Sequence, residues 1–150
     1  MQLRELLAAT APETELVLDL KGTKVCVAEK TLEAIVPFLG ARRFTVCARA
    51  WPLLEPFAGL PVRRLHSIGT ESELRRFLER FGADRLEGVS IHERLLRPDT
   101  VAALRSIADV VLTWTVNRPA RASELVRLGV DGIVTDDVAT LSQPGVLAPA

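Results

Sequence analysis

An acidic and a basic residue close a short apolar run near the start of the sequence, which reads LVLDLK over positions 16–21. Side chains alternate between the two faces of a β-strand, so Asp19 and Lys21 share one face. They lie at the C-terminal end of the expected strand, where α/β proteins place their sites. A carboxylate there can hold a hard divalent cation, and an ammonium can neutralise a phosphate oxygen. The spacing fits such a site, and it equally fits a structural ion pair.

Trp114 is a further candidate, because it stands in the apolar run 110–116. A large aromatic residue in a parallel strand either fills the core or forms the wall of a ligand site. Asn117 follows the run and precedes a proline, which favours a structural role as a helix N-cap. Asp136 closes a later run, where it either caps a terminal helix or faces the mouth of a site.

The chain holds two histidines, a residue type suited to acid–base catalysis near neutral pH. His66 ends one expected strand and His92 lies just past another, so both fit the rim at the strand ends. The default interpretation of each is an exposed or locally bonded loop histidine.

Composition limits the classes of function. The 150 residues carry 19 basic and 19 acidic side chains, so the formal net charge is zero and no nucleic-acid partner is expected. Cys26 and Cys47 lack any metal-site or disulfide-framework spacing, which favours a reduced, cytoplasmic setting. No apolar run approaches the roughly 20 residues that cross a bilayer, so neither a membrane span nor a cleavable signal is expected.

Short apolar runs alternate with amphipathic segments along the chain. Six runs rich in aliphatic and β-branched residues predict strands at 15–20, 43–48, 62–66, 86–91, 110–115 and 132–135. Strands that alternate with helices pair in parallel through right-handed crossovers, so the predicted fold class is α/β. The pattern leaves two architectures open, an open doubly wound sheet and part of a (β/α)₈ barrel.

Helix signals occupy the segments between the expected strands. The segment 31–39 ends at Gly40, a suitable C-cap, and Thr70 with Glu73 forms a capping-box signature. Further helix ends are marked by two prolines suited to a first turn and by one glycine suited to a stop, namely Pro98, Pro119 and Gly129.

Two motifs near the C-terminus are similar to those of a known family. They read Thr-Trp-Thr-Val-Asn at 113–117 and Gly-Val-Asp-Gly-Ile-Val-Thr-Asp at 129–136. They resemble the closing strands of the glycerophosphodiester phosphodiesterases, whose barrels end with a Trp-Thr-Val-Asn strand, a helix and a Gly-Val-Asp-Gly-Ile-x-Thr-Asp strand. The resemblance implies an incomplete TIM-type (β/α) barrel over 1–136, with about six parallel strands that correspond to the third to eighth of the family barrel. A C-terminal tail is expected over 137–150.

The resemblance also implies roles for the candidate residues. Asp19-Leu20-Lys21 resembles the Glu-x-Lys strand motif of the family, which implies that Asp19 is a metal ligand and that Lys21 is a catalytic residue near the substrate phosphate. Trp114 is similar to the aromatic residue on the glycerol side of the pocket. The implied reaction belongs to lipid metabolism. It hydrolyses a small-molecule glycerophosphodiester to an alcohol and glycerol 3-phosphate, with a divalent metal ion, Mg²⁺ or Ca²⁺.

The family motifs that supply the acid–base histidines do not occur in this sequence. Neither His66 nor His92 stands in a His-Arg-Gly or His-Asp motif, and the metal-binding Glu-x-Asp pair is also missing. We therefore expect the sequence to begin after the first two barrel strands and to bind a metal only if the N-terminal ligands are supplied. The isolated chain is expected to be inactive. Two unpaired sheet edges would remain, which favours self-association.

Three hypotheses stay open at this point. In the first, the chain is the C-terminal part of a phosphodiesterase whose start was lost. In the second, it is a catalytically degenerate family member that acts as a binding or oligomerisation module. In the third, it is an unrelated open α/β regulatory domain.

Overall fold

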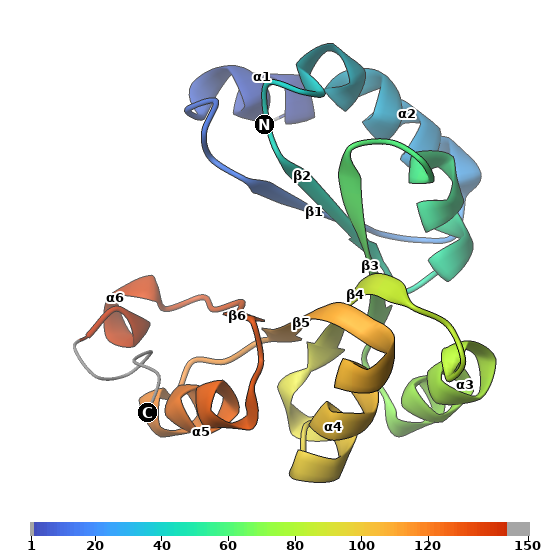
Figure 1. The fold of residues 1–150 in the computed structure, drawn as a ribbon. Coiled ribbons are helices and arrows are strands. Elements are labelled where there is room, and N and C mark those ends of the chain that lie inside the picture. The colour runs from blue at the N-terminus through green and yellow to red at the C-terminus, as the bar shows by residue number, and fades with distance from the viewer. Residues whose placement is uncertain (1, 144–150) are drawn as a thin grey trace. The chain divides into compact units, whose positions relative to one another are not determined.

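Parallel strands connected by helices build the chain, whose residues 2–143 are described by a computed structural model (Figure 1). The predicted α/β class is confirmed, because every described strand pair is parallel. The chain divides into two compact units, Met1–Ser67 and Ile68–Ala150.

Three parallel strands run through the first unit in the order β1, β2, β3. They are β1 (Leu16–Leu20), β2 (Phe44–Ala48) and β3 (Val62–Ile68), the last of which reaches the boundary between the units. The helical segments are α1 (Leu3–Ala9), α2 (Val25–Ile35) and the 3₁₀ turns η1 (Val36–Phe38) and η2 (Trp51–Phe57). The three strands match their predicted positions closely, because each is an apolar run between turn residues.

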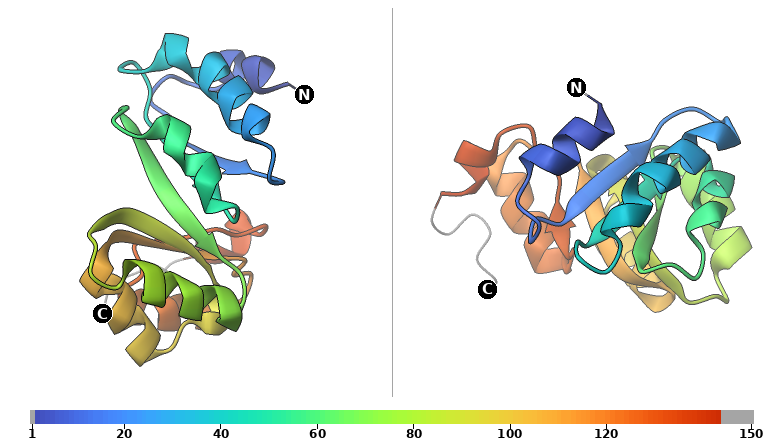
Figure 2. Two further views of the ribbon diagram at one scale, coloured as in Figure 1. Left: turned by 90° about the vertical axis from the view of Figure 1, so that its right-hand side faces the viewer. Right: turned by 90° about the horizontal axis from the view of Figure 1, so that it is seen from above.

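The core of the first unit lies between its helices and strands. Leu7 of α1 and Ile35 of α2 are buried together with Phe44 of β2 and Phe57 of η2. Figure 2 shows α1 and α2 lying together along the β1–β2 pair. These apolar side chains leave water on folding, which holds the two helices against the strands.

A buried arginine fastens α1, a helix that sequence patterns did not predict. The Arg42 guanidinium donates to the carbonyl oxygen of Thr10 at 2.6 Å and to the Thr10 hydroxyl at 2.5 Å. It also lies 3.4 Å from the carbonyl oxygen of Leu7. These oxygens lie at the C-terminal end of α1, where helix carbonyls lack partners within the helix. Arg42 therefore caps this end from a position more than thirty residues away.

The predicted helix 31–39 differs from the one observed. Helix α2 begins six residues earlier, at Val25, and passes into η1 at Val36. Pro37 lacks the N–H that an α-helix needs, so the chain continues as a 3₁₀ turn. Gly40 follows η1 with a φ of +87°, so it is a turn residue rather than the direct cap of α2.

The second unit repeats the alternation with the strand order β4, β5, β6. Its strands are β4 (Leu86–His92), β5 (Ala108–Trp114) and β6 (Gly132–Ile133). Its helical segments are α3 (Glu71–Phe81), the 3₁₀ turn η3 (Glu93–Leu95), α4 (Pro98–Ile107), α5 (Pro119–Leu128) and α6 (Val138–Leu141). The last strand is shorter than the predicted 132–135.

Most helix-end signals of the second unit are confirmed. The Thr70 hydroxyl accepts from the backbone N–H of Glu73 at 3.2 Å, and the Glu73 carboxylate accepts from the N–H of Thr70 at 3.1 Å. Pro98 and Pro119 are the first residues of α4 and α5. Gly129 follows α5 with a φ of +91°, a conformation that favours glycine.

The C-terminal stretch that was predicted as a tail is only partly described. Within it, Val138–Leu141 forms the short helix α6, whereas 144–150 lie outside the described residues. The predicted boundary between 136 and 137 stays a prediction. No helix between residues 2 and 143 is long and apolar enough to span a membrane.

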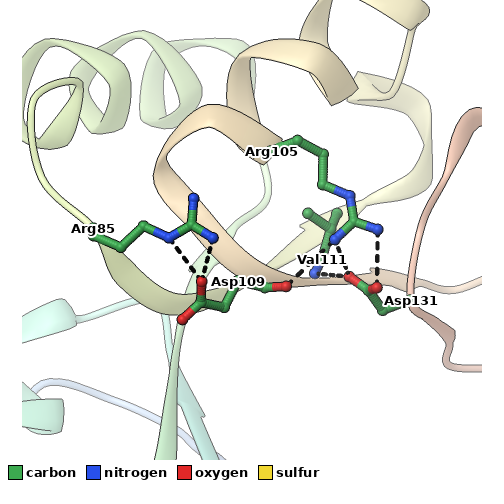
Figure 3. A network of polar contacts seen from close by, with 5 residues as sticks. All are labelled: Arg85, Arg105, Asp109, Val111 and Asp131. Atoms are coloured by element: carbon green, nitrogen blue, oxygen red, sulfur yellow. Dashed lines mark hydrogen bonds and ion pairs between the residues drawn. The ribbon is translucent and has the colours of Figure 1, made fainter.

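A polar network fixes the middle of β5 against the start of β6 (Figure 3). The Asp131 carboxylate accepts two hydrogen bonds from Arg105, at 2.8 and 2.9 Å, and one from the backbone N–H of Val111, at 2.7 Å. The backbone N–H of Asp131 in turn donates to the carbonyl oxygen of Val111 at 2.9 Å. Asp131 therefore aligns the two strands and α4.

Replacing Asp131 with alanine is expected to lower the free energy of unfolding by about 2 kcal/mol, because two bonds from Arg105 and one from a backbone N–H to its carboxylate, which is 34% exposed, are lost. Asp109→Ala is the matched control. Its carboxylate pairs with Arg85 in an exposed ion pair, so its loss should cost less than about 1 kcal/mol. Denaturant unfolding of both variants measures the difference. Equal losses would show that the Asp131 contacts do not align the strands.

Candidate functional site

Asp19 and Lys21 lie at the C-terminal end of β1 and form an ion pair between Lys21 Nζ and Asp19 Oδ2. The structure thus brings together the two residues that the sequence singled out. The side chain of Lys21 is 80% exposed and that of Asp19 is 46% exposed. An exposed pair of this kind contributes at most about 1 kcal/mol, so either partner can exchange it for another charged group at small cost.

Two buried residues whose position near Asp19 the sequence did not predict lie in the first unit. Cys47 of β2 is the register partner of Asp19, and Ser67 lies near the end of β3. Burial raises the pKa of the Cys47 thiol from its ordinary value of 9.0 to about 11, and the Asp19 carboxylate adds to the increase. The Ser67 hydroxyl acts in the opposite direction, as a hydrogen-bond partner of the sulfur. Cys47 is therefore a protonated, unreactive thiol at neutral pH.

The first unit does not by itself supply a metal site. Among residues 2–143, no group of three or more His, Cys, Asp or Glu side chains could hold a metal ion. Asp19 offers one carboxylate, which forms its ion pair with a cation, Lys21. Hard divalent cations bind more ligands than this, so the donors present do not fit a complete site.

Trp114 and His92 form a contact in the second unit. They are register partners at the C-terminal ends of β5 and β4, and their rings meet edge to face with centroids 5.0 Å apart. Both residues are half-buried. Trp114 is therefore partly buried, and both sequence interpretations of this residue stay predictions.

His92 is locally bonded, as its default interpretation expected. Its Nδ1 accepts a hydrogen bond from the backbone N–H of Arg94 at 3.2 Å, which makes His92 the N-cap of η3. His66 lies in the first unit, half-buried, with its ring edge-on to Trp51 at a centroid distance of 6.0 Å.

Arg121 holds the turn that follows His92. Its guanidinium donates to the Glu93 carboxylate at 2.8 Å and to the carbonyl oxygens of Glu93 and Leu96 at 2.6 and 3.0 Å. The side chains of Arg121 and Glu93 are only 15% and 14% exposed. Burial lowers the pKa of Arg121, but the carboxylates of Glu124 and Glu93 outweigh this effect and raise it above its usual value. Arg121 is therefore a permanent cation that fixes the turn.

The role expected for Asn117 needs correction. The N-cap of α5 is Arg118 and not Asn117, and its side chain makes no capping bond. Instead, the Asn117 Oδ1 accepts from the Thr135 hydroxyl at 2.9 Å and from the backbone N–H of Asp136 at 3.0 Å. Asn117 is structural, as expected, but it joins the segments that follow β5 and β6. The Asp136 carboxylate lies 3.4 Å from the Asn117 amide nitrogen.

Parallel strands with polar residues at their C-terminal ends place the chain in the class of TIM-type (β/α) barrel proteins. The profile of the glycerophosphoryl diester phosphodiesterase family matches residues 18–140. This match covers most of the chain, so the chain belongs to that family. A search of proteins with curated descriptions found no match.

Solved structures with the same fold agree with this assignment. A glycerophosphodiester phosphodiesterase from Thermotoga maritima matches with a TM-score of 0.75 and 21% identity, over 94% of this chain and 62% of its own. A protein of Silicibacter pomeroyi assigned as a glycerophosphoryl diester phosphodiesterase matches with a TM-score of 0.73 and 22% identity, over 97% and 54%. A phosphodiesterase of Oleispira antarctica, solved with the product sn-glycerol-3-phosphate, matches with a TM-score of 0.65 and 18% identity, over 82% and 51%.

The chain therefore spans between 51% and 62% of the length of these relatives. The likeness confirms the predicted fold, part of a TIM-type barrel with six parallel strands. The third hypothesis, an unrelated open α/β domain, is wrong, because the family match identifies the chain. The roles predicted for Asp19, Lys21 and Trp114 stay predictions.

Proposed function

We propose that the chain contributes the phosphate-binding and glycerol-binding groups of a glycerophosphodiester phosphodiesterase, which hydrolyses a glycerophosphodiester to an alcohol and glycerol 3-phosphate. The observation that carries the proposal is the Asp19–Lys21 pair at the C-terminal end of β1, in a chain that belongs to this family. Strand ends of this kind are where barrel enzymes place catalytic residues.

Lys21 is the residue to which we assign the phosphate. Its ammonium neutralises a phosphoryl oxygen and stabilises the negative charge that develops when the diester is attacked. To do so it exchanges the Asp19 carboxylate for the phosphate, a small cost because the pair is exposed. Trp114 offers a half-buried aromatic surface for the glycerol part of the substrate.

Asp19 is proposed as one ligand of a divalent metal ion, Mg²⁺ or Ca²⁺, which would polarise the phosphate when bound. The other ligands and the acid–base histidines have to come from outside these 150 residues, because the sequence lacks the His-Arg-Gly and Glu-x-Asp motifs. The isolated chain is therefore expected to bind the product without hydrolysing the diester.

A binding experiment tests the role of Lys21. The chain is expected to bind sn-glycerol 3-phosphate, and Lys21→Met should weaken the affinity about tenfold, because one charge-assisted contact is lost. Isothermal titration calorimetry measures the dissociation constants. Lys24→Met is the matched control, since Lys24 is an exposed lysine that precedes α2, and it should leave the affinity unchanged.

Two outcomes would contradict the proposal. Equal affinity in the Lys21→Met variant and the unmodified chain would remove Lys21 from the site. Robust turnover of glycerophosphocholine by the purified chain with Mg²⁺ or Ca²⁺, abolished by Asp19→Ala, would show that the missing histidine motifs are not needed.

The second candidate function is a catalytically degenerate module that self-associates, and exposed valines on the outermost strands favour it. Val17 of β1 is 49% exposed, and Val134, which follows β6, is 44% exposed. Within the described part of the chain, β1 pairs only with β2 and β6 pairs only with β5. An unpaired strand edge is a template for another chain. Light scattering is expected to show a mass that rises with concentration, and a monomer at all concentrations would exclude this function.

A further inference from the structure

His92 and Trp114 present a hydrogen-bond donor and an aromatic surface next to each other in the second unit. They are register partners at the C-terminal ends of neighbouring parallel strands, with ring centroids 5.0 Å apart and ring planes at 66°. The edge-to-face arrangement fixes each ring against the other. Both side chains remain half-buried, so neither is sealed within the core.

The hydrogen bond at Nδ1 decides which chemistry His92 offers. Nδ1 accepts from the N–H of Arg94, so Nδ1 carries no hydrogen and the ring donor is Nε2–H. Within residues 2–143, the Nε2–H of His92 donates no hydrogen bond. His92 therefore presents an N–H donor in a fixed tautomer.

The turn that carries His92 is held in place from both sides. Leu95 and Leu96, which follow it, are 6% and 2% exposed. The Arg121 guanidinium binds the carbonyl oxygens of Glu93 and Leu96. A donor on a turn that is already fixed loses little conformational entropy when it binds a ligand.

We propose that His92 is a substrate-binding residue whose Nε2–H donates to a hydroxyl oxygen of a glycerol moiety packed against Trp114. An N–H donor beside an aromatic surface suits a small polyol, whose C–H groups contact the ring while a hydroxyl oxygen accepts the hydrogen bond. The assignment of glycerol rests on the proposed function.

Nitrogen NMR of the histidine side chains tests the proposal in the unmodified chain. Addition of sn-glycerol 3-phosphate is expected to shift the Nε2 signal of His92 and the indole signal of Trp114 with one shared dissociation constant. Trp51 serves as the internal control, because its indole N–H already donates to the carbonyl oxygen of Ser67 at 3.0 Å. Glycerol alone should shift the same two signals, whereas inorganic phosphate should not.

Two variants distinguish the contribution of the His92 N–H donor to binding from that of its ring. His92→Phe keeps a ring beside Trp114 but removes the donor, and it should weaken binding of sn-glycerol 3-phosphate about fivefold. His92→Gln keeps an N–H donor and should stay within about twofold of the unmodified chain. Binding of inorganic phosphate should be equal in all three proteins.

The outcomes distinguish this proposal from the proposed function. If sn-glycerol 3-phosphate binds in a Lys21-dependent manner and His92 does not respond, the role of His92 is overturned while the phosphate site stands. If glycerol shifts the Nε2 signal of His92 but Lys21→Met leaves the affinity for sn-glycerol 3-phosphate unchanged, the role of Lys21 is contradicted and that of His92 is supported. If neither glycerol nor sn-glycerol 3-phosphate shifts His92, the proposal is overturned, whether or not the chain hydrolyses diesters.

Discussion

Replacing Arg121 with methionine is expected to lower the free energy of unfolding by about 3 kcal/mol. Methionine fills much of the volume of the arginine side chain. It leaves the Glu93 carboxylate, which is 14% exposed, without its ion pair to Arg121. It also removes the donors to the carbonyl oxygens of Glu93 and Leu96. Leaving a buried charge and two carbonyl oxygens without these donors costs more than the loss of a surface ion pair. Chemical denaturation monitored by circular dichroism measures the change.

Arg118→Met is the control for this substitution. Arg118 is exposed and precedes α5, the helix that carries Arg121, so its replacement should change the stability by less than about 0.5 kcal/mol. Adding Glu93→Gln to Arg121→Met should recover part of the loss, because the unpaired carboxylate disappears. A loss below about 1 kcal/mol for Arg121→Met alone would show that the clamp on the 93–96 turn adds little to the stability of the fold.

The free energy of unfolding is expected to fall by about 2 kcal/mol as the pH rises from 9 to 11, through the ionisation of Cys47. Its pKa is about 11 in the folded chain against an ordinary value of 9.0. Well below pH 9 the thiol is protonated in both states, so the stabilisation is fully present. Between the two values the unfolded chain releases the proton while the folded chain keeps it, and stability declines by about 1.4 kcal/mol per pH unit.

Cys47→Ala provides the decisive comparison. This variant lacks the thiol, so its stability should fall less steeply over the same pH range, and the difference from the unmodified chain gives the contribution of Cys47. Cys26 is exposed, so Cys26→Ser should keep the slope of the unmodified chain. Parallel stability curves for the unmodified chain and Cys47→Ala would refute the assignment. A thiol reagent should also label Cys26 in the folded chain and reach Cys47 only after unfolding.

The strands could be predicted from the sequence because each is a local apolar run between turn residues. The runs at 43–48 and 62–66 became β2 and β3 with shifts of one or two residues. Helix ends with a local chemical signal were equally accessible, as the capping box of Thr70 and Glu73 shows. The family motif at 129–136 also contains Asp131, whose role in aligning the strands emerged only from its contacts.

Elements that depend on distant contacts could not be predicted in this way. Helix α1 is short, and its C-terminal end is capped by Arg42 from a separate part of the chain. The 3₁₀ segment η2 contains Pro52 and Pro56, which obscure a helical pattern. Neither α1 nor η2 can therefore be predicted from a short stretch of sequence.

The contacts of the candidate site are likewise of two kinds, those that follow from local sequence and those that depend on strand pairing. The pairing of Asp19 with Lys21 follows from their spacing of two residues on one strand. The position of Cys47 beside Asp19 depends on the register between β1 and β2, and no feature of either segment states that register. The contact between His92 and Trp114 likewise requires the pairing of β4 with β5.

The register of β4 and β5 also limits which length changes this family segment tolerates. Deleting one residue between Val110 and Trp114 would turn the indole to the opposite side of the sheet, because successive side chains in a strand alternate. The same deletion in the loop before Arg85, which lies outside both strands, would leave the alternation intact. Over evolutionary time, insertions and deletions should therefore accumulate in the loops and spare the 110–114 segment, even where individual side chains change.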